Sequence, residues 1–121
     1  MQFDPHRSDW LVACLCAAWC GTCNEYRVVF EAVAKHHPDA RFVWVDIEDH
    51  ADALGEELDI ENFPTLLIAH GDAARFFGVV LPHAGTIART LDAARAADLR
   101  SGVPVPGGLV AAVRAVGEVV A

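Results

Sequence analysis

A short apolar run leads directly into a C-x-x-C pair, and this order of features limits the folds open to the chain. The run from Trp10 to Cys16 is short enough to be a strand buried on both faces. Beyond the pair, apolar side chains recur at helical spacing until His37-Pro38 ends the pattern. These helical positions are Cys23, Tyr26, Phe30 and Val33. The sequence therefore predicts a strand that turns into a helix at the first cysteine of the pair, Cys20.

A C-x-x-C pair at the start of a helix favours thiol–disulfide chemistry. Cys20 lies at the predicted helix N-terminus, where unpaired backbone N–H groups and the helix dipole lower the pKa of a thiol. Cys23 follows one turn later in a more buried position, near enough to close a disulfide. We therefore expect Cys20 to attack a disulfide and Cys23 to resolve the mixed disulfide. Gly21 is expected to allow a tight turn, and Thr22 places a polar group between the sulfurs.

The same pair could be half of a zinc site, which needs four ligands. No second C-x-x-C and no H-x-x-x-H follows it in the sequence. Cys14 and Cys16 alternate along the predicted strand, and we expect them to face opposite sides of it, so that neither joins the pair around one ion. They are interpreted as small buried hydrophobic residues, with a regulatory redox role as the alternative. A structural metal and a cluster-bridging dimer are the less favoured alternatives for the pair.

The composition argues against several classes of function. The chain has 121 residues, 54% apolar and 21% charged, which fits one domain with one core. Its formal net charge of -8 argues against nucleic acid and anionic membranes, which attract clustered Lys and Arg. No apolar run reaches the roughly 18 residues that span a bilayer. The cysteines cluster instead of tying distant segments together, and the first residues do not resemble a signal peptide, so we expect a cytoplasmic location.

The remaining periodicity predicts an α/β order of elements. Further strands are predicted over 41–47, 66–69 and 75–79. The turn of a hairpin is expected at Gly71-Asp72, and helices are expected after Asp49 and over about 83–97. The order β-α-β-α-β-β-α indicates a parallel pair of strands followed by an antiparallel hairpin.

The composition changes after Leu99. A Pro- and Gly-rich break over 100–108 precedes a last apolar pattern, whose three- and four-residue steps predict a helix over 109–120. We therefore divide the chain into a domain at 1–99 and a segment at 100–121, in which a linker leads to a C-terminal helix packed on the same domain. A dimer or partner contact is the alternative role of this helix.

The residues around the cysteine pair resemble the thioredoxin family. Trp19-Cys20-Gly21-Thr22-Cys23 is similar to the family motif W-C-G-P-C, with Thr in place of Pro. Phe63-Pro64-Thr65 resembles the family's cis-proline segment, and Val45-Asp46-Ile47-Glu48 resembles its second-strand pattern. Gly78 stands where the family carries a glycine in the last strand. The resemblance covers roughly residues 10–97 and implies that residues 1–99 form a thioredoxin-like domain.

The resemblance also implies roles for these residues. Pro64 is expected to be cis beside Cys20, and Phe63, Pro64 and Thr65 are expected to position an extended substrate chain. Trp19 is expected to shield the sulfurs, with an ordinary core position as the alternative. The implied fold is α/β, with a central mixed four-stranded sheet flanked by helices. It lacks the family's first strand and helix and carries an extra C-terminal helix.

The chain departs from the family at three positions near the pair. Cys14 replaces a buried acid, Trp44 stands in place of its lysine partner, and Cys16 replaces an aromatic residue. Because the acid helps to move the proton of the resolving cysteine, we expect release by Cys23 to be slower than in a standard thioredoxin. The strand over 41–47 would lie on an exposed edge of the sheet, covered by the C-terminal helix or by a second subunit.

Together these features predict a thiol–disulfide oxidoreductase of thioredoxin type, without a bound cofactor or metal. It would reduce or exchange protein disulfides through Cys20 and Cys23 and receive electrons from a reductase or a small thiol. No nucleic-acid or membrane partner is expected, and a homodimer is one option. The alternative function is a non-catalytic thioredoxin-fold module that binds a protein partner through the Trp19–Pro64 surface. The cysteine pair favours the enzyme, and the missing acid favours the module.

Overall fold

A computed structural model describes most of the chain. The described residues are 10–17, 21–38, 40–50, 65–71, 73–79, 83–96, 105 and 108–120. Four of the predicted site residues lie outside these ranges: Trp19, Cys20, Phe63 and Pro64. The helix predicted after Asp49 also lies outside them.

A mixed sheet forms the centre of the fold, with its strands in the order β4-β3-β1-β2-β5. The strands are β1 (Trp10–Cys16), β2 (Arg41–Asp46), β3 (Thr65–His70), β4 (Ala73–Val79) and β5 (Glu118–Val119). β1 and β2 are parallel, whereas β3 is antiparallel to both β1 and β4. Gly71, at a φ of 61°, makes the turn between β3 and β4. The α/β class and the mixed sheet predicted from the sequence are confirmed.

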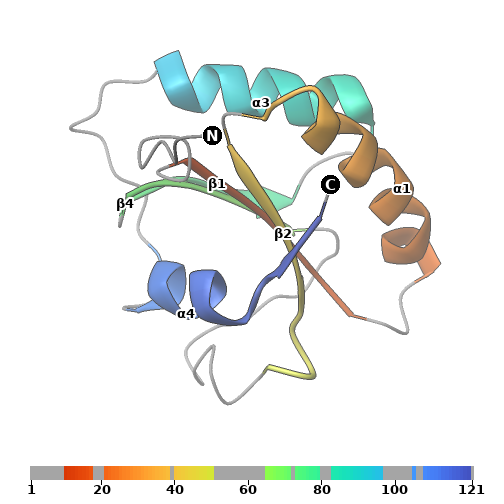
Figure 1. The fold of residues 1–121 in the computed structure, drawn as a ribbon, viewed down its shortest axis with the longest axis vertical. Coiled ribbons are helices and arrows are strands. Elements are labelled where there is room, and N and C mark those ends of the chain that lie inside the picture. Colours follow the sequence, from red (N-terminus) through yellow and green to blue (C-terminus); the bar gives the residue numbers. More distant parts are fainter. Residues whose placement is uncertain are drawn as a thin grey trace, which may run out of the picture.

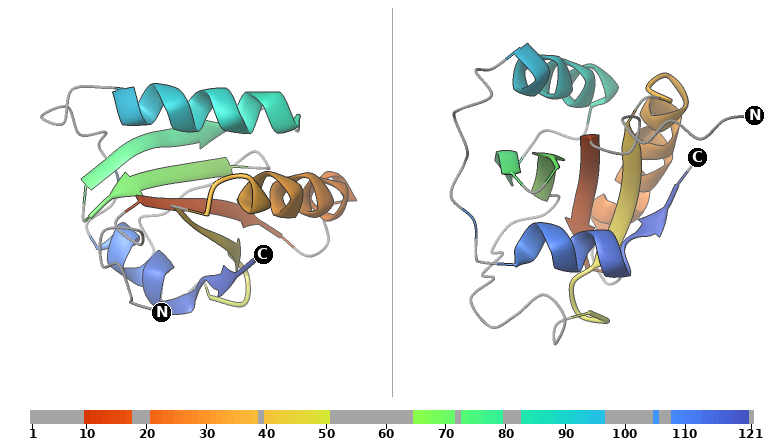
Figure 2. Two further views of the ribbon diagram at one scale, coloured as in Figure 1. Left: turned by 45° about the horizontal axis from the view of Figure 1, so that its top comes forward. Right: turned by 60° about the vertical axis from the view of Figure 1, so that its left-hand side comes forward.

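Helices cover both faces of the sheet (Figure 1). Helices α1 (Gly21–Lys35) and α3 (Ala84–Ala96) lie on one face, and α4 (Leu109–Val116) lies on the other (Figure 2). Each face therefore has its own buried core. Side chains of β1 divide between the two cores, because successive residues of a strand point to opposite faces.

Aromatic packing fixes α1 against the sheet. All four positions that carried the predicted helical spacing, Cys23, Tyr26, Phe30 and Val33, are buried. The ring centroid of Phe30 lies 5.3 Å from that of Phe42 and 5.8 Å from that of Trp44, both on β2. These contacts hold α1, which begins near the end of β1, against β2.

The C-terminal segment differs from its prediction. The helix expected over 109–120 ends at Val116, and β5 follows it, antiparallel to β2. Gly117 causes the change: a Cβ on it would lie 2.8 Å from the side chain of Val43, so only glycine lets the chain approach β2 this closely. The backbone N–H of Val120 then donates to the carbonyl of Phe42 at 3.0 Å. Among the described residues the sheet thus has five strands instead of the predicted four, and the C-terminal strand β5 covers the edge of β2.

Helix α4 buries an apolar stripe against the second face of the sheet. Leu109, Val110 and Val113 are buried there together with side chains of β1, β2 and β3. The division of the chain at residues 99 and 100 stays a prediction.

Candidate redox site

Two cysteines meet where β1 ends and α1 begins. Cys16 is the last residue of β1, and Cys23 lies in the first turn of α1. The structure joins them in a disulfide, with their Cα atoms 5.9 Å apart. Each residue is only 1% exposed. The site is therefore a buried disulfide that links the central strand of the sheet to the helix that follows it.

Cys14 lies on the same face of β1 as Cys16, and the expectation that they face opposite sides is wrong. A strand repeats every two residues, so positions 14 and 16 point the same way. Their sulfur atoms are 3.5 Å apart, and both lie in the core that contains Cys23. Since the sulfur of Cys16 is bonded to Cys23, the thiol of Cys14 is the hydrogen-bond donor in this contact.

The groups beside the disulfide are held in their neutral forms. Burial raises the pKa of the Cys14 thiol far above its ordinary value. Burial also raises the pKa of Tyr26, and the negative charge that Cys14 would carry raises it further. The Tyr26 hydroxyl is buried with no hydrogen-bond partner among the described residues. The groups beside the disulfide are therefore buried and uncharged.

Trp44 stands opposite Cys14 in the register of the parallel strands β1 and β2. The two positions that are predicted to replace an acid–lysine pair are therefore neighbours in the sheet. The charged groups lie further out: the guanidinium of Arg27 lies 5.2 Å from the centre of the Trp44 ring and donates to Glu118 at 3.1 Å. Trp44 is thus in contact with a charged group although its register partner on β1 is the neutral Cys14.

A hollow of about 240 Å³ has Trp44 among its lining residues. Its walls include Ala17, which directly follows Cys16, and Asn24, which directly follows Cys23. Asp46 also lines the hollow, and its Oδ1 accepts the backbone N–H groups of Glu48 and Asp49 at 2.9 and 3.2 Å. The hollow brings solvent-facing polar groups to the two segments that carry the disulfide.

The other predicted site residues fall in different parts of the fold. Gly21 is the first residue of α1 and Thr22 the second. A Cβ on Gly21 would meet none of the described atoms within 4 Å, and its φ is not positive, so the expected need for glycine in a tight turn has no support at this position. Thr65 begins β3, is buried, and pairs with Leu15, the residue before Cys16. The structure thus brings Thr65 to the end of β1 that carries the disulfide.

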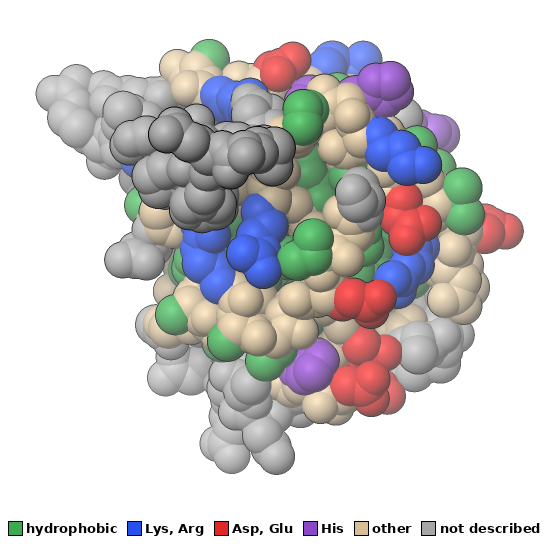
Figure 3. Space-filling model, viewed as in Figure 1, with side chains coloured by type: hydrophobic (Ala, Val, Ile, Leu, Met, Phe, Trp, Pro, Cys, Tyr) green, Lys and Arg blue, Asp and Glu red, His purple; other side chains and the backbone are tan. Residues whose placement is uncertain are grey.

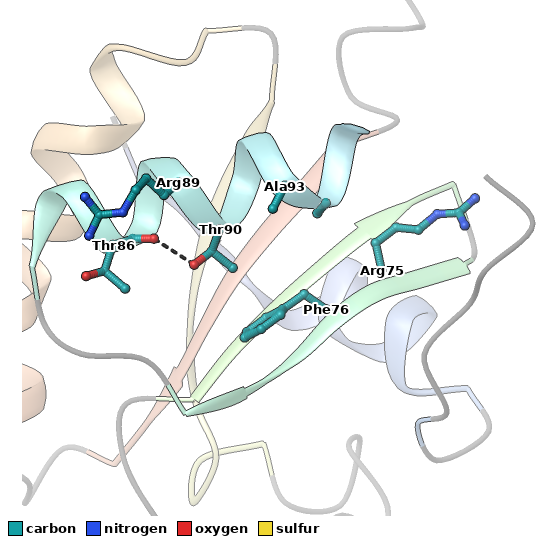
Figure 4. Close-up of a pocket in the computed structure, with 7 residues that line it drawn as sticks. Arg75, Phe76, Thr86, Arg89, Thr90 and Ala93 are labelled. Atoms are coloured by element: carbon teal, nitrogen blue, oxygen red, sulfur yellow. Dashed lines mark hydrogen bonds between the residues drawn. The ribbon is translucent and has the colours of Figure 1, made fainter. Parts of the chain in front are cut away.

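A second hollow, of about 370 Å³, lies between β4 and α3 (Figure 4). Arg75 and Arg89 are among its residues, but their guanidinium groups extend from opposite ends of the hollow. Inside it, the hydroxyl of Thr90 donates to the carbonyl of Thr86 at 2.7 Å. The two cations do not converge on one point, so this hollow is not built around a single anion.

Metal-ligand clusters and membrane-spanning helices are both lacking among the described residues. Within the described ranges, no three His, Cys, Asp or Glu side chains are grouped so that they could hold a metal ion. No helix in the described part of the chain is long and apolar enough to cross a membrane. Basic and acidic side chains are interspersed on the face seen in Figure 3.

Comparison with known proteins agrees with the fold. The family model described as Thioredoxin matches residues 4–92. Thioredoxin f from spinach chloroplasts superposes with a TM-score of 0.64 at 23% identity, over 74% of each chain. Oxidised mitochondrial thioredoxin 3 from Saccharomyces cerevisiae superposes with a TM-score of 0.61 at 20% identity, over 73% of this chain and 81% of that one. The layers and the strand-to-helix site therefore define a thioredoxin fold.

Curated relatives match over shorter stretches. The thioredoxin of Mycoplasma genitalium is 36% identical over 52 residues, and that of Mycoplasmoides gallisepticum is 39% identical over 51 residues. These matches cover 43% and 42% of this chain and 50% of each relative, so the chain spans about half the length of the curated relatives it matches. On the family match, the chain belongs to the thioredoxin family.

The sequence analysis missed Cys16 as a partner of Cys23. The signal was available in the spacing of the cysteines. Two cysteines at positions i and i+2 of a strand share a face, and here the helix that carries Cys23 covers that face. The assumption of opposite faces removed Cys16 from consideration.

Proposed function

We propose that this protein is a thiol–disulfide oxidoreductase that reduces or exchanges protein disulfides through Cys20 and Cys23. The observation that carries the proposal is the position of Cys23. It lies in the first turn of α1 at the end of the central strand, in a thioredoxin fold, and its sulfur is engaged in a disulfide. Membership of the thioredoxin family supports the same reaction class.

The proposed reaction has two exchange steps. The thiolate of Cys20 attacks a disulfide of the substrate, forms a mixed disulfide and releases one substrate thiolate. The thiolate of Cys23 then attacks the sulfur of Cys20, closes the Cys20–Cys23 disulfide and releases the second substrate thiolate. The substrate gains two electrons, and the protein loses two. No cofactor or metal takes part.

The other residues of the motif would position the substrate. Trp19, Phe63 and Pro64 would form the surface that receives an extended chain. Thr65 supports this assignment, because it begins β3 beside the residue that precedes Cys16. Gly21 and Thr22 would set the path of the chain between the two cysteines.

A reductase or a small thiol would return electrons to the oxidised protein. We propose a cytoplasmic location, because a reducing compartment would regenerate the dithiol and the cysteines are clustered for local exchange. Measuring the size of the protein in solution would test whether it forms a homodimer.

The test is reduction of a protein disulfide, such as those of insulin, with dithiothreitol as the electron source. The wild-type protein is expected to accelerate the reaction, and Cys20→Ser is expected to return the rate to that of dithiothreitol alone. Val28→Ala is the control, because Val28 lies on the outside of α1 and is 70% exposed. A Cys20→Ser variant as fast as the wild type would overturn the proposal.

A partner-binding module is the second candidate, and two observations favour it. The buried acid is replaced by Cys14, which stays neutral, and Cys23 is occupied by Cys16. Both would slow resolution of a mixed disulfide. A folded wild-type protein that gives no acceleration over dithiothreitol alone would favour this module over the enzyme.

A further inference from the structure

Cys23, which the proposed reaction needs to resolve the mixed disulfide, is bonded to Cys16 in the structure. We propose that Cys16 is a third redox cysteine, which takes the sulfur of Cys23 from Cys20 and leaves Cys20 as a single reactive thiol. This inference rests on the proposed function, since it adds a second partner to the same exchange site. It makes Cys23 the shared member of two alternative disulfides.

The fold holds Cys16 and Cys23 within bonding reach. Their Cα atoms are 5.9 Å apart, inside the range of about 4.4–6.8 Å that disulfides require. The carbonyl of Cys16 accepts the backbone N–H of Ile47 at 2.9 Å, which fixes the end of β1 beside the end of β2. Tyr26 and Phe30 hold α1 against the sheet, because both are buried in the same core as the two cysteines. The packing of β1 and α1 therefore holds Cys16 and Cys23 close to each other.

The exchange is balanced without an added oxidant. In the product of the proposed reaction, Cys20 and Cys23 are joined and Cys16 is a thiol. The sulfur of Cys16, as its thiolate, attacks the sulfur of Cys23, so that a Cys16–Cys23 bond forms and the Cys20–Cys23 bond breaks. Cys20 leaves as a thiolate and accepts the proton that Cys16 gave up. The number of disulfides stays at one, and its position moves into the core.

Cys14 does not extend this exchange further. Its sulfur lies 3.5 Å from that of Cys16, but the structure bonds Cys16 to Cys23 and leaves Cys14 as a free thiol. Cys14 therefore donates a hydrogen bond to Cys16 and stays reduced. The exchange of disulfide partners therefore ends with the Cys16–Cys23 bond.

The inner disulfide changes what the protein can do with a substrate. With Cys23 engaged by Cys16, Cys20 can still form a mixed disulfide, but Cys23 cannot resolve it. Release then requires a low-molecular-weight thiol, which reduces the mixed disulfide directly. The oxidised protein would act as a single-thiol exchanger, and the fully reduced protein as a dithiol reductase.

Thiol labelling of the oxidised protein tests the inference. Folded wild-type protein is oxidised with glutathione disulfide in excess, freed of small molecules by gel filtration and alkylated with iodoacetamide in denaturant. It is then digested with chymotrypsin, and fragment spectra locate the label; glutathione attached to Cys20 counts as a thiol outside the internal disulfide. We expect Cys14 and Cys20 to be free of internal disulfides, and Cys16 and Cys23 to be linked. Label on Cys16, with Cys20 and Cys23 linked, would overturn the inference.

Variants separate Cys16 from the other cysteines. Cys20→Ser is expected to lose two of its three thiols on oxidation, and adding Cys14→Ala is expected to leave that loss unchanged. Adding Cys16→Ala or Cys16→Val to Cys20→Ser is expected to abolish it; two substitutions are used in case one fails to fold. A disulfide that persists in both of these double variants would show that Cys16 is not the partner of Cys23.

The inference and the proposed function fail in different experiments. Cys16→Ala tests the inference, because it removes Cys16 and leaves Cys20 and Cys23 in place. Its oxidised form is expected to have Cys20 and Cys23 linked, whereas insulin reduction by the wild type and by Cys20→Ser tests the proposed function. If only the function fails, the labelling pattern of the wild type still identifies the Cys16–Cys23 disulfide while no variant reduces insulin.

Discussion

Cys14 and Trp44 are direct register partners across the parallel strands β1 and β2. Cys14 is fully buried, and Trp44 is partly buried against the same core. The pair therefore supplies no charge beside the sulfurs of Cys16 and Cys23. In the proposed mechanism, this uncharged pair would therefore offer no base to accept the proton of Cys23.

Replacing Cys14 with Asp is expected to speed turnover of a protein disulfide. A carboxylate at this position could accept the proton of Cys23, and the expected gain is about tenfold, below the usual range for a well-positioned general base. The measurement is steady-state reduction of insulin. Cys14→Asn is the matched control, because it has the shape of Asp but accepts no proton in this way. Unchanged turnover in Cys14→Asp, or an equal gain in Cys14→Asn, would refute the slow-release hypothesis.

The free energy of unfolding is expected to fall as the pH rises above the pKa of an ordinary thiol. Burial raises the pKa of Cys14 from 9.0, and burial with the charge of Cys14 raises that of Tyr26 from 10.0. Both groups are neutral in the folded and unfolded states at neutral pH, so they do not lower the free energy of unfolding there. Above about pH 9 the unfolded chain loses protons that the folded chain keeps, and each group then lowers the free energy of unfolding by up to about 1.4 kcal/mol per pH unit.

Urea unfolding of the oxidised protein from about pH 7 to pH 10 measures this dependence. Cys14→Ala is expected to be less sensitive to pH between about pH 9 and pH 10, where Cys14 contributes most in the wild type. Equal slopes in the two proteins would mean that Cys14 ionises in the folded state as easily as in the unfolded chain.

Removing the hydroxyl of Tyr26 is expected to leave the protein as stable or to stabilise it. This hydroxyl is buried without a hydrogen-bond partner among the described residues, and such a group costs about 1–3 kcal/mol. Tyr26→Phe is expected to raise the free energy of unfolding by up to about 1 kcal/mol. Tyr26→Leu is the control and is expected to be destabilising, because it also removes the ring packed against Phe30. A clear loss of stability in Tyr26→Phe would mean that the hydroxyl has a partner.

Gly117→Ala is expected to destabilise the junction of α4 and β5. The added Cβ would lie 2.8 Å from Val43 and from the carbonyl oxygen of Val113, so the strand must move away from β2. A loss of about 1–3 kcal/mol is expected in thermal or urea unfolding. Gly85→Ala in α3 is the control, since its Cβ would make only an ordinary contact with Arg89, and a small gain is expected there. Equal stability of the two variants would contradict the close approach of β5 to β2.

Local pattern was sufficient to predict much of the fold. The bounds of β1 agree with the apolar run from Trp10 to Cys16, because a strand buried on both faces needs apolar residues throughout. The spacing of Cys23, Tyr26 and Phe30 predicted the buried face of α1, because neighbours on a helix face recur every three or four residues. Both signals are periodic and do not depend on distant parts of the chain.

Long-range contacts explain what the sequence pattern missed. The pattern from Leu109 to Val120 fits one helix, but the contact of Gly117 with Val43 ends α4 early and allows Val119 to pair with β2. No local rule shows that a glycine will meet a strand more than seventy residues earlier. The error at Cys16 was different, since the two-residue period of a strand already placed it beside Cys14. The roles of Trp19, Cys20, Phe63 and Pro64 stay predictions.

The redox equilibrium of the protein against glutathione buffers tests the central claim most directly. Free thiols are trapped at each ratio of reduced to oxidised glutathione and counted by mass, and attached glutathione is counted separately. The account predicts a reversible two-electron transition in which two of the four cysteines become linked and Cys23 is always one of them. A protein with four unlinked cysteines at every ratio, or with Cys23 free in the oxidised form, would contradict it.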